Sequence, residues 1–264
     1  MNDGEALRGR VALVTGGSKG VGKGVAEALG EVGATVYVTG RSVADTEFSA
    51  ACIPIPCDHT DDGQVESAFA QIYSDRGRID LLVNNVWGGY ERMIEDGQFT
   101  WGLPFWRQPL FRWDAMFSAG VRAHFVASRL AARRMVEQRS GLIVNISFWP
   151  AQKHIANVPY GVSKAATDKM TRDMAHELTE YGVAVVSLYP GLVRTEKVME
   201  AAEYLDLTNS ESPQFIGRAV AALATDPNIL ALTGSVVLAA SCAEKYGFTD
   251  VDGRRPTALT IDDV

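Results

Sequence analysis

The chain has 264 residues, and 25 Lys and Arg against 32 Asp and Glu give it a net charge of −7 at pH 7. This acidic balance argues against a nucleic-acid partner, because proteins that bind nucleic acids present Lys and Arg to the phosphate backbone. With 47% hydrophobic and 22% charged residues, the chain can bury a sizeable core, which excludes disordered and collagen-like classes.

Targeting signals and metal-ligand patterns are not evident in the sequence. Its three cysteines form no C-x-x-C or Cys/His cluster, which argues against a disulfide framework or a metal site and favours the reducing cytoplasm. The first residues lack the basic and apolar regions of a signal peptide. The apolar stretch 219–240 is interrupted by Asp226 and Pro227, so we expect no integral membrane segment.

Short apolar runs alternate with helical patterns along the chain. We expect strands at 11–15, 35–39, 81–84, 142–147, 183–189 and 235–238, and helices that include 20–30, 64–77 and 113–138. Strands that alternate with helices predict a parallel sheet, and runs that are apolar throughout predict helices on both faces. The sequence therefore predicts an α/β fold with a doubly wound, Rossmann-like parallel sheet in a single domain over 1–264.

A glycine-rich turn follows the first strand and opens a helix, with the spacing G-x-x-x-G-x-G. Such a turn lets backbone N–H groups and the positive helix terminus approach a pyrophosphate. The alternative is a flexible turn without a ligand. The cofactor contacts predicted here are Gly16, Ser18, Lys19, Gly20, Val21 and Gly22.

The second strand ends at Gly40-Arg41, where no carboxylate is available for a ribose 2′-hydroxyl. An arginine at this place favours a 2′-phosphate, and Lys19 adds a second cation, so we expect NADP(H) in preference to NAD(H). Alternatively, Arg41 and Lys19 are solvated surface charges.

Two segments depart from the alternation. The segment 88–112 is rich in aromatic residues, glycine and proline, and we interpret it as a substrate insertion for a bulky apolar molecule; packing against the fold or a partner subunit is the alternative. The segment 194–214 follows a strand end and is interpreted as a lid. Among individual side chains, we expect Trp87, Trp106 and His154 to contact substrate.

A phenol and an ammonium lie four residues apart in Tyr160-Gly161-Val162-Ser163-Lys164. On a helix this spacing puts both side chains on one face, and a nearby cation favours the ionised phenol, as a general acid/base requires. Ser147 ends a predicted strand, where its hydroxyl could hold a carbonyl oxygen. The alternative roles are a buried core tyrosine, a solvated lysine and a strand-end cap.

Together these motifs resemble the short-chain dehydrogenase/reductase family over nearly the whole chain. Residues 15–22 match its T-G-x-x-x-G-x-G turn, Cys57-Asp58 its adenine-ring aspartate, and 84–88 its N-N-A-G segment. Ser147, Tyr160 and Lys164 match its catalytic set, and 190–195 match its P-G-x-V-x-T segment. The resemblance adds these cofactor residues: Asp58, Asn84, Tyr160, Lys164, Pro190, Gly191, Val193 and Thr195.

The resemblance implies a reversible, NADPH-dependent reduction of a ketone or aldehyde. Tyr160 would give the proton, Ser147 would bind the carbonyl oxygen, and Lys164 would lower the pKa of the phenol and bind the nicotinamide ribose. It also implies a homo-oligomer, a dimer or tetramer paired through long helices. A non-catalytic NADP(H)-binding sensor or scaffold is the competing class, and retention of the three catalytic residues argues against it.

One position departs from the family pattern. The family often has an asparagine seven residues after the tryptophan that starts the long helix, where it completes a proton relay. Here that position is Gly120, so the relay must use water, backbone or another side chain, with His124 as one candidate. The motifs 105–109, 158–161, 175–178 and 222–229 are similar to a subgroup named dehydrogenase/reductase SDR family member one, which implies bulky ketone substrates.

Overall fold

The computed structural model describes residues 3–200 and 202–264. In these residues a seven-stranded sheet has the order β3-β2-β1-β4-β7-β8-β9, with every neighbouring pair parallel. Its strands are β1 (Val11–Thr15), β2 (Thr35–Gly40), β3 (Cys52–Pro56), β4 (Leu81–Asn84), β7 (Gly141–Ile146), β8 (Val183–Tyr189) and β9 (Val236–Leu238). The predicted Rossmann-like parallel sheet is confirmed.

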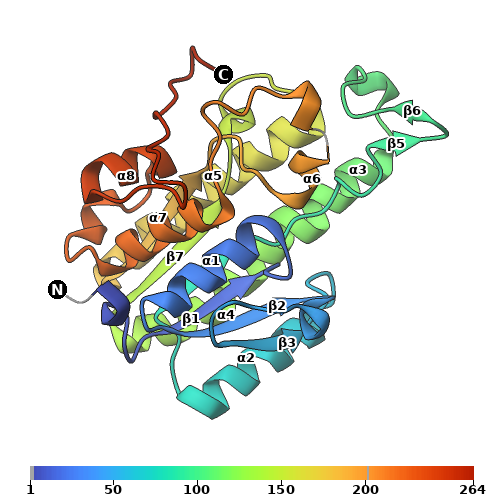
Figure 1. The fold of residues 1–264 in the computed structure, drawn as a ribbon. Helices are drawn as coiled ribbons and strands as arrows, with labels where there is room; N and C mark the ends of the chain where they lie inside the picture. Colours follow the sequence, from blue (N-terminus) through green and yellow to red (C-terminus); the bar gives the residue numbers. More distant parts are fainter. Residues whose placement is uncertain (1–2, 201) are drawn as a thin grey trace.

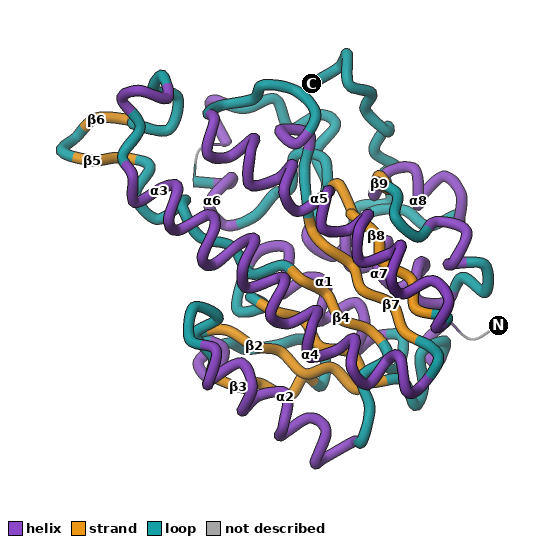
Figure 2. The backbone as a smooth tube through the Cα atoms, turned by 180° about the vertical axis from the view of Figure 1, so that it is seen from behind, coloured by secondary structure: helices purple, strands orange, loops and turns teal. Residues whose placement is uncertain are grey.

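Helices cover both faces of this sheet because successive strand residues point to opposite sides. Ala12 and Val14 of β1 pack into one core with the helices α1 and α7, while Val11 and Leu13 pack into a second core with α2, α4 and α5. Figure 1 shows α1 and α7 on one face of the sheet, and Figure 2, seen from behind, shows α4 and α5 on the other face. The main helices are α1 (Gly20–Glu31), α2 (Asp62–Arg76), α4 (Ala123–Gln138), α5 (Val158–Leu178), α7 (Pro213–Thr225) and α8 (Ala239–Tyr246).

Polar side chains fix where several helices begin. Asp61 accepts hydrogen bonds from the N–H groups of Gly63 and Gln64 at the start of α2. The side chain of Asn157 accepts from the N–H of Tyr160 at the start of α5. These caps satisfy amide groups that have no partner inside the helix. The cap at Asn157 therefore sets the position of Tyr160 in the first turn of α5.

The segment 88–112 contains more regular structure than predicted. It includes a hairpin of β5 (Ile94–Glu95) and β6 (Gln98–Phe99), the 3-10 turn η3 (Phe105–Arg107) and the start of α3 (Leu110–Ala115). Figure 1 shows β5 and β6 at the tip of an arm that projects from the sheet. The edge strand β3 was also not predicted; its two prolines weaken the sequence signal for a strand.

The helix predicted at 113–138 is interrupted by a π-helical segment. It begins as α3, continues through the π-helix η4 (Met116–Arg122) and ends as α4. The segment 194–214, predicted as a lid, contains α6 (Glu196–Met199) and η7 (Ala202–Tyr204). The other short turns are η1 (Asp3–Glu5), η2 (Val43–Asp45), η5 (Trp149–Ala151), η6 (Thr179–Tyr181) and η8 (Ile229–Leu232). No helix in the described part of the chain is long and apolar enough to cross a membrane.

Candidate active site

The glycine turn between β1 and α1 is too tight for side chains. At Gly16, which has a φ of +66°, an added Cβ would lie 2.6 Å from the Cα of Val86. At Gly22, an added Cβ would lie 2.4 Å from the Nδ2 of Asn85. Asn85 itself holds the turn, since its Nδ2 donates to the carbonyl oxygens of Thr15 at 3.2 Å and Gly16 at 2.8 Å. The resemblance places Asn85 in the N-N-A-G segment, and the structure identifies the carbonyl groups to which it donates.

A carboxylate lies at the open end of this turn. The N–H of Gly20, the first residue of α1, donates to both carboxylate oxygens of Glu196, at 3.3 and 3.1 Å. The N-terminus of a helix attracts anions through its free N–H groups and its dipole. The Glu196 carboxylate stands in for phosphate oxygens here, so the turn fits a pyrophosphate-containing cofactor.

Two of the predicted cofactor residues follow the neighbouring strands β2 and β3. Arg41 is exposed, and its guanidinium lies 3.8 Å from the carboxylate of Glu91. Hydrogen bonds from Thr60 lower the pKa of Asp58, and the charge of Arg41 lowers it further. Ser18 is half-buried in the turn and Val21 is half-buried at the start of α1, while Lys19 is exposed immediately before α1. Lys19 and Arg41 thus place two exposed cations around the carboxyl ends of β1 and β2.

Asn84 is deeper than its predicted role suggests. It is fully buried, and its Nδ2 donates to Ser128 Oγ and Asn145 Oδ1, both at 2.8 Å. In the described residues its Oδ1 has no hydrogen-bond partner. These bonds tie β4 to β7 and α4 beneath the glycine turn.

The predicted catalytic residues meet at the carboxyl end of β7. Ser147 directly follows this strand, Tyr160 and Lys164 lie on the first two turns of α5, and all three are buried. Lys164 Nζ donates to the Ile146 carbonyl at 3.3 Å, and Ser147 Oγ donates to the Lys164 carbonyl at 3.5 Å. The loop after β7 and the start of α5 are therefore bonded together.

Lys164 rests on an indole ring that Gly120 accommodates. The Nζ of Lys164 lies 3.7 Å from the ring centroid of Trp87, a cation–π geometry. A Cβ added at Gly120 would lie 2.7 Å from a carbon of the same ring. Gly120 belongs to the π-helix η4, and such segments often occur at functional sites. An asparagine at this position would clash with Trp87.

Burial controls the protonation of both titrating groups. It lowers the pKa of Lys164 to about 7, while the charge of Asp168 acts in the opposite direction. It raises the pKa of Tyr160 well above 10, and the neighbouring Tyr90 raises it further. The expected lowering of the phenol pKa by Lys164 is wrong for this arrangement, because the ammonium lies 6.0 Å from the Tyr160 ring and bonds elsewhere. Tyr160 is therefore a protonated phenol at neutral pH.

Three aromatic rings surround the Tyr160 ring. The centroids of Trp101, Trp87 and Tyr90 lie 5.3, 5.9 and 6.1 Å from it. Tyr90 also donates a hydrogen bond of 3.0 Å to Tyr160 Oη. The sequence places both Tyr90 and Trp101 in the predicted aromatic insertion, but it does not predict their contact with Tyr160.

The other two residues expected at the substrate lie away from this cluster. Trp106 is 73% exposed on η3 and packs edge-on against Phe105. His154 is exposed in the loop after η5. Neither side chain makes a hydrogen bond or ring contact with Tyr160 in the described residues. Of the three predicted substrate contacts, the structure brings only Trp87 to Tyr160.

The segment 190–195 is held by a buried glutamate. The N–H of Gly191 donates to Glu211 Oε2 at 2.6 Å, and Val193 forms a β-bridge with Glu211. Burial raises the pKa of Glu211 to about 7. Pro190 is buried after β8, and Thr195 caps α6 by accepting from the N–H of Val198. Glu211 thus fixes the backbone of a segment predicted to contact the cofactor.

His124 is neutral and bonded to the backbone. Burial lowers its pKa to about 3, and its Nε2 lies 2.9 Å from the Val86 carbonyl oxygen. Since a carbonyl only accepts, Nε2 carries the proton. Its Nδ1 has no hydrogen-bond partner among the described residues, and no hydrogen bond links His124 to Tyr160 there.

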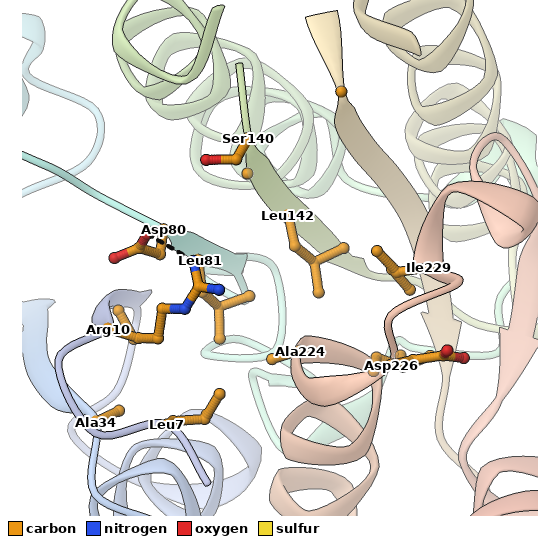
Figure 3. A pocket seen from close by; sticks show the side chains of 14 residues that line it. Leu7, Arg10, Ala34, Asp80, Leu81, Ser140, Leu142, Ala224, Asp226 and Ile229 are labelled. Atoms are coloured by element: carbon orange, nitrogen blue, oxygen red, sulfur yellow. Dashed lines mark hydrogen bonds and ion pairs between the residues drawn. The ribbon is translucent and has the colours of Figure 1, made fainter. Parts of the chain in front are cut away.

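A separate cavity lies at the other end of the sheet, near the amino ends of the strands (Figure 3). Its lining includes Arg10 and Asp80, which form an ion pair at 3.2 Å, but none of the predicted catalytic residues. Ligands of open parallel sheets bind at the carboxyl ends of the strands, where the predicted catalytic residues lie. Within 3–200 and 202–264, no cluster of three or more His, Cys, Asp or Glu side chains could hold a metal ion.

Comparisons with known proteins agree with this geometry. The family model described as short chain dehydrogenase matches residues 10–205. "Dehydrogenase/reductase SDR family member 1" from Mus musculus is 41% identical over 94% of this chain and 85% of its own length, and the Homo sapiens protein of that name is 40% identical over the same shares. A solved short-chain type dehydrogenase/reductase from Mycobacterium marinum, 28% identical, superimposes with a TM-score of 0.73 over 88% of this chain and 94% of that one. The chain therefore belongs to the short-chain dehydrogenase/reductase family of oxidoreductases, whose members bind a nicotinamide cofactor.

Proposed function

We propose that this protein is an NADPH-dependent carbonyl reductase that acts on bulky, largely apolar ketones or aldehydes. The observation that carries the proposal is the buried phenol of Tyr160, which lies beside Lys164 at the carboxyl edge of the sheet. Because burial keeps this phenol protonated, it is set to give a proton to a carbonyl oxygen, which is the reductive direction.

The cofactor preference rests on charge at the ends of β1 and β2. The glycine turn and the start of α1 would hold the pyrophosphate, in the place that the Glu196 carboxylate now takes. Arg41 and Lys19 would pair with a 2′-phosphate, and no acidic residue ends β2 to favour a free ribose hydroxyl. The bound cofactor would supply the hydride for the carbonyl carbon.

The three catalytic side chains divide the remaining work. Tyr160 donates its proton to the carbonyl oxygen as negative charge develops there. Ser147 donates a hydrogen bond to the same oxygen once it exchanges its long bond to the Lys164 carbonyl, 3.5 Å in the free protein. Lys164 would bind the nicotinamide ribose of the cofactor, and its own low pKa makes its charge sensitive to pH near 7.

The apolar substrate class follows from the rings around Tyr160. Trp87, Tyr90 and Trp101 present large faces and few polar atoms next to the phenol. Such surfaces bind flat or bulky apolar groups through contact area. Tyr160 is only 7% exposed, so these rings must separate to admit a substrate.

We also infer self-association through the helix that runs from α3 into α4. Its outer face exposes Trp113 and Phe125, at 41% and 51%. A second copy would cover these side chains, and sedimentation of the purified protein tests this inference.

A Tyr160→Phe variant tests the proposed activity. We expect it to lose carbonyl reduction by at least about a hundredfold, because a general acid contributes that much or more, while NADPH binding persists. NADPH absorbance would be followed with a panel of quinones, steroids and aromatic ketones, and NADPH binding by fluorescence. Unchanged turnover in the variant would overturn the mechanism. Binding of NADPH by the native protein without turnover of any panel member would favour a sensor.

A further inference from the structure

The arm residue Tyr90 makes a hydrogen bond that no motif of the family accounts for. Its Oη lies 3.0 Å from the Oη of Tyr160, and its ring packs on Trp101, with centroids 5.2 Å apart. Tyr90 is 41% exposed, whereas Tyr160 is 7% exposed. Tyr90 therefore links the exposed arm to the buried acid, with its hydroxyl at the buried end of the side chain.

This hydrogen bond is compatible with catalysis by Tyr160. A phenol has one O–H and two acceptor lone pairs. Tyr90 uses one lone pair of Tyr160, so the O–H of Tyr160 stays free for a carbonyl oxygen. The two hydroxyl groups can therefore act in series.

The position of Lys164 leaves a need for such a partner. Its Nζ bonds to the Ile146 carbonyl and rests on Trp87, and Gly120 offers no side chain for a relay. In the described residues, Tyr90 is the hydrogen-bond partner of the Tyr160 hydroxyl. Resting on the proposed function, we propose that Tyr90 is a catalytic proton-relay residue that returns a proton to Tyr160 after each reduction.

The proton balance of the relay is simple. As hydride adds to the carbonyl carbon, the carbonyl oxygen takes the proton of Tyr160 and the O–H bond of Tyr160 breaks. The Tyr160 phenolate then takes the proton of Tyr90. When the rings separate to exchange product for solvent, the Tyr90 phenolate takes a proton from water, and the hydroxide that remains is neutralised by the buffer.

A Tyr90→Phe variant tests the relay, with Tyr181→Phe as the matched control. Tyr181 lies on η6, which precedes β8. It is therefore near the amino ends of the strands, whereas the site is at their carboxyl ends. With phenanthrenequinone and NADPH, we expect Tyr90→Phe to lower kcat roughly tenfold to a hundredfold, to leave KM within about twofold and to enlarge the solvent deuterium isotope effect. We expect the control to match the native enzyme in all three quantities.

A second readout needs neither cofactor nor turnover. In protein labelled with ¹³Cζ-tyrosine, Tyr90→Phe should shift the Tyr160 resonance, because that carbon reports hydrogen bonding to its oxygen, and Tyr181→Phe should not. An unshifted resonance, an unchanged kcat or an unchanged isotope effect each overturns the relay. If Tyr160→Phe abolishes turnover and Tyr90→Phe does not lower it, only the relay fails. If Tyr160→Phe keeps turnover, the proposed function fails as well.

Discussion

The carboxylate of Glu196 competes for the place that a cofactor pyrophosphate would take. Both of its oxygens accept from the N–H of Gly20, at 3.3 and 3.1 Å. A negative charge at a helix N-terminus is stabilised by about 0.3–1 kcal/mol at exposed positions, and Glu196 is exposed. Cofactor binding must break this interaction, so the free energy of the interaction between Glu196 and Gly20 is subtracted from the favourable free energy of cofactor binding.

Glu196→Gln keeps an oxygen that can accept from Gly20 but removes the charge. About 0.3–1 kcal/mol corresponds to roughly a twofold to fivefold gain in affinity, since 1.4 kcal/mol is tenfold. The gain should be equal for NADPH and NADH, which share the pyrophosphate, and it should shrink in high salt. Fluorescence titration or calorimetry measures it directly.

The matched control is Glu200→Gln, in the same segment 194–214. Glu200 is exposed and pairs with Lys197 at 3.5 Å, so this variant removes the same charge without touching Gly20. It should change affinity by less than Glu196→Gln. Equal gains in the two variants would show that the change in affinity comes from the net charge of the protein and not from the contact with Gly20. A loss of affinity in Glu196→Gln would refute the competition and indicate that the carboxylate assists binding.

Three further changes test the cofactor site and the buried cluster. Arg41→Ala should weaken NADPH binding roughly tenfold and leave NADH nearly unchanged in fluorescence titration; equal losses would contradict the 2′-phosphate assignment. Gly120→Ala should destabilise the fold by about 1–3 kcal/mol in urea unfolding, because the new Cβ would lie 2.7 Å from the Trp87 ring. Replacing glycine by alanine inside a helix usually stabilises a protein, and that result here would refute the clash. The pKa of Lys164 falls from 10.5 to about 7 on folding. Between these pH values unfolding takes up a proton, so the stability of the native protein rises with pH there. Lys164→Met should remove a rise in unfolding free energy of roughly 3–5 kcal/mol, and an unchanged rise would contradict the low pKa of Lys164.

Much of the scaffold could be predicted because its signals are local. The bounds of β1, β4 and β8 agree with the apolar runs, since strands buried on both faces need apolar side chains throughout. The hairpin β5–β6 also has a local signal in the sequence, the dipeptide Asp96-Gly97. These residues adopt φ values of +48° and +75°, as a two-residue hairpin turn requires. The π-helix η4 and the Tyr90–Tyr160 bond had none, because both depend on how distant segments pack.

The site also shows why a family motif does not transfer one residue at a time. Gly120 has no side chain for a relay, but that same absence makes room for Trp87, and the Trp87 ring in turn holds the Lys164 ammonium at 3.7 Å. An asparagine restored at Gly120 would displace the indole and remove the support of Lys164 before it could bind a water. Glycine, tryptophan and lysine therefore act as one unit here, and the proton route that we propose runs instead through the hydroxyl of Tyr90, 3.0 Å from that of Tyr160.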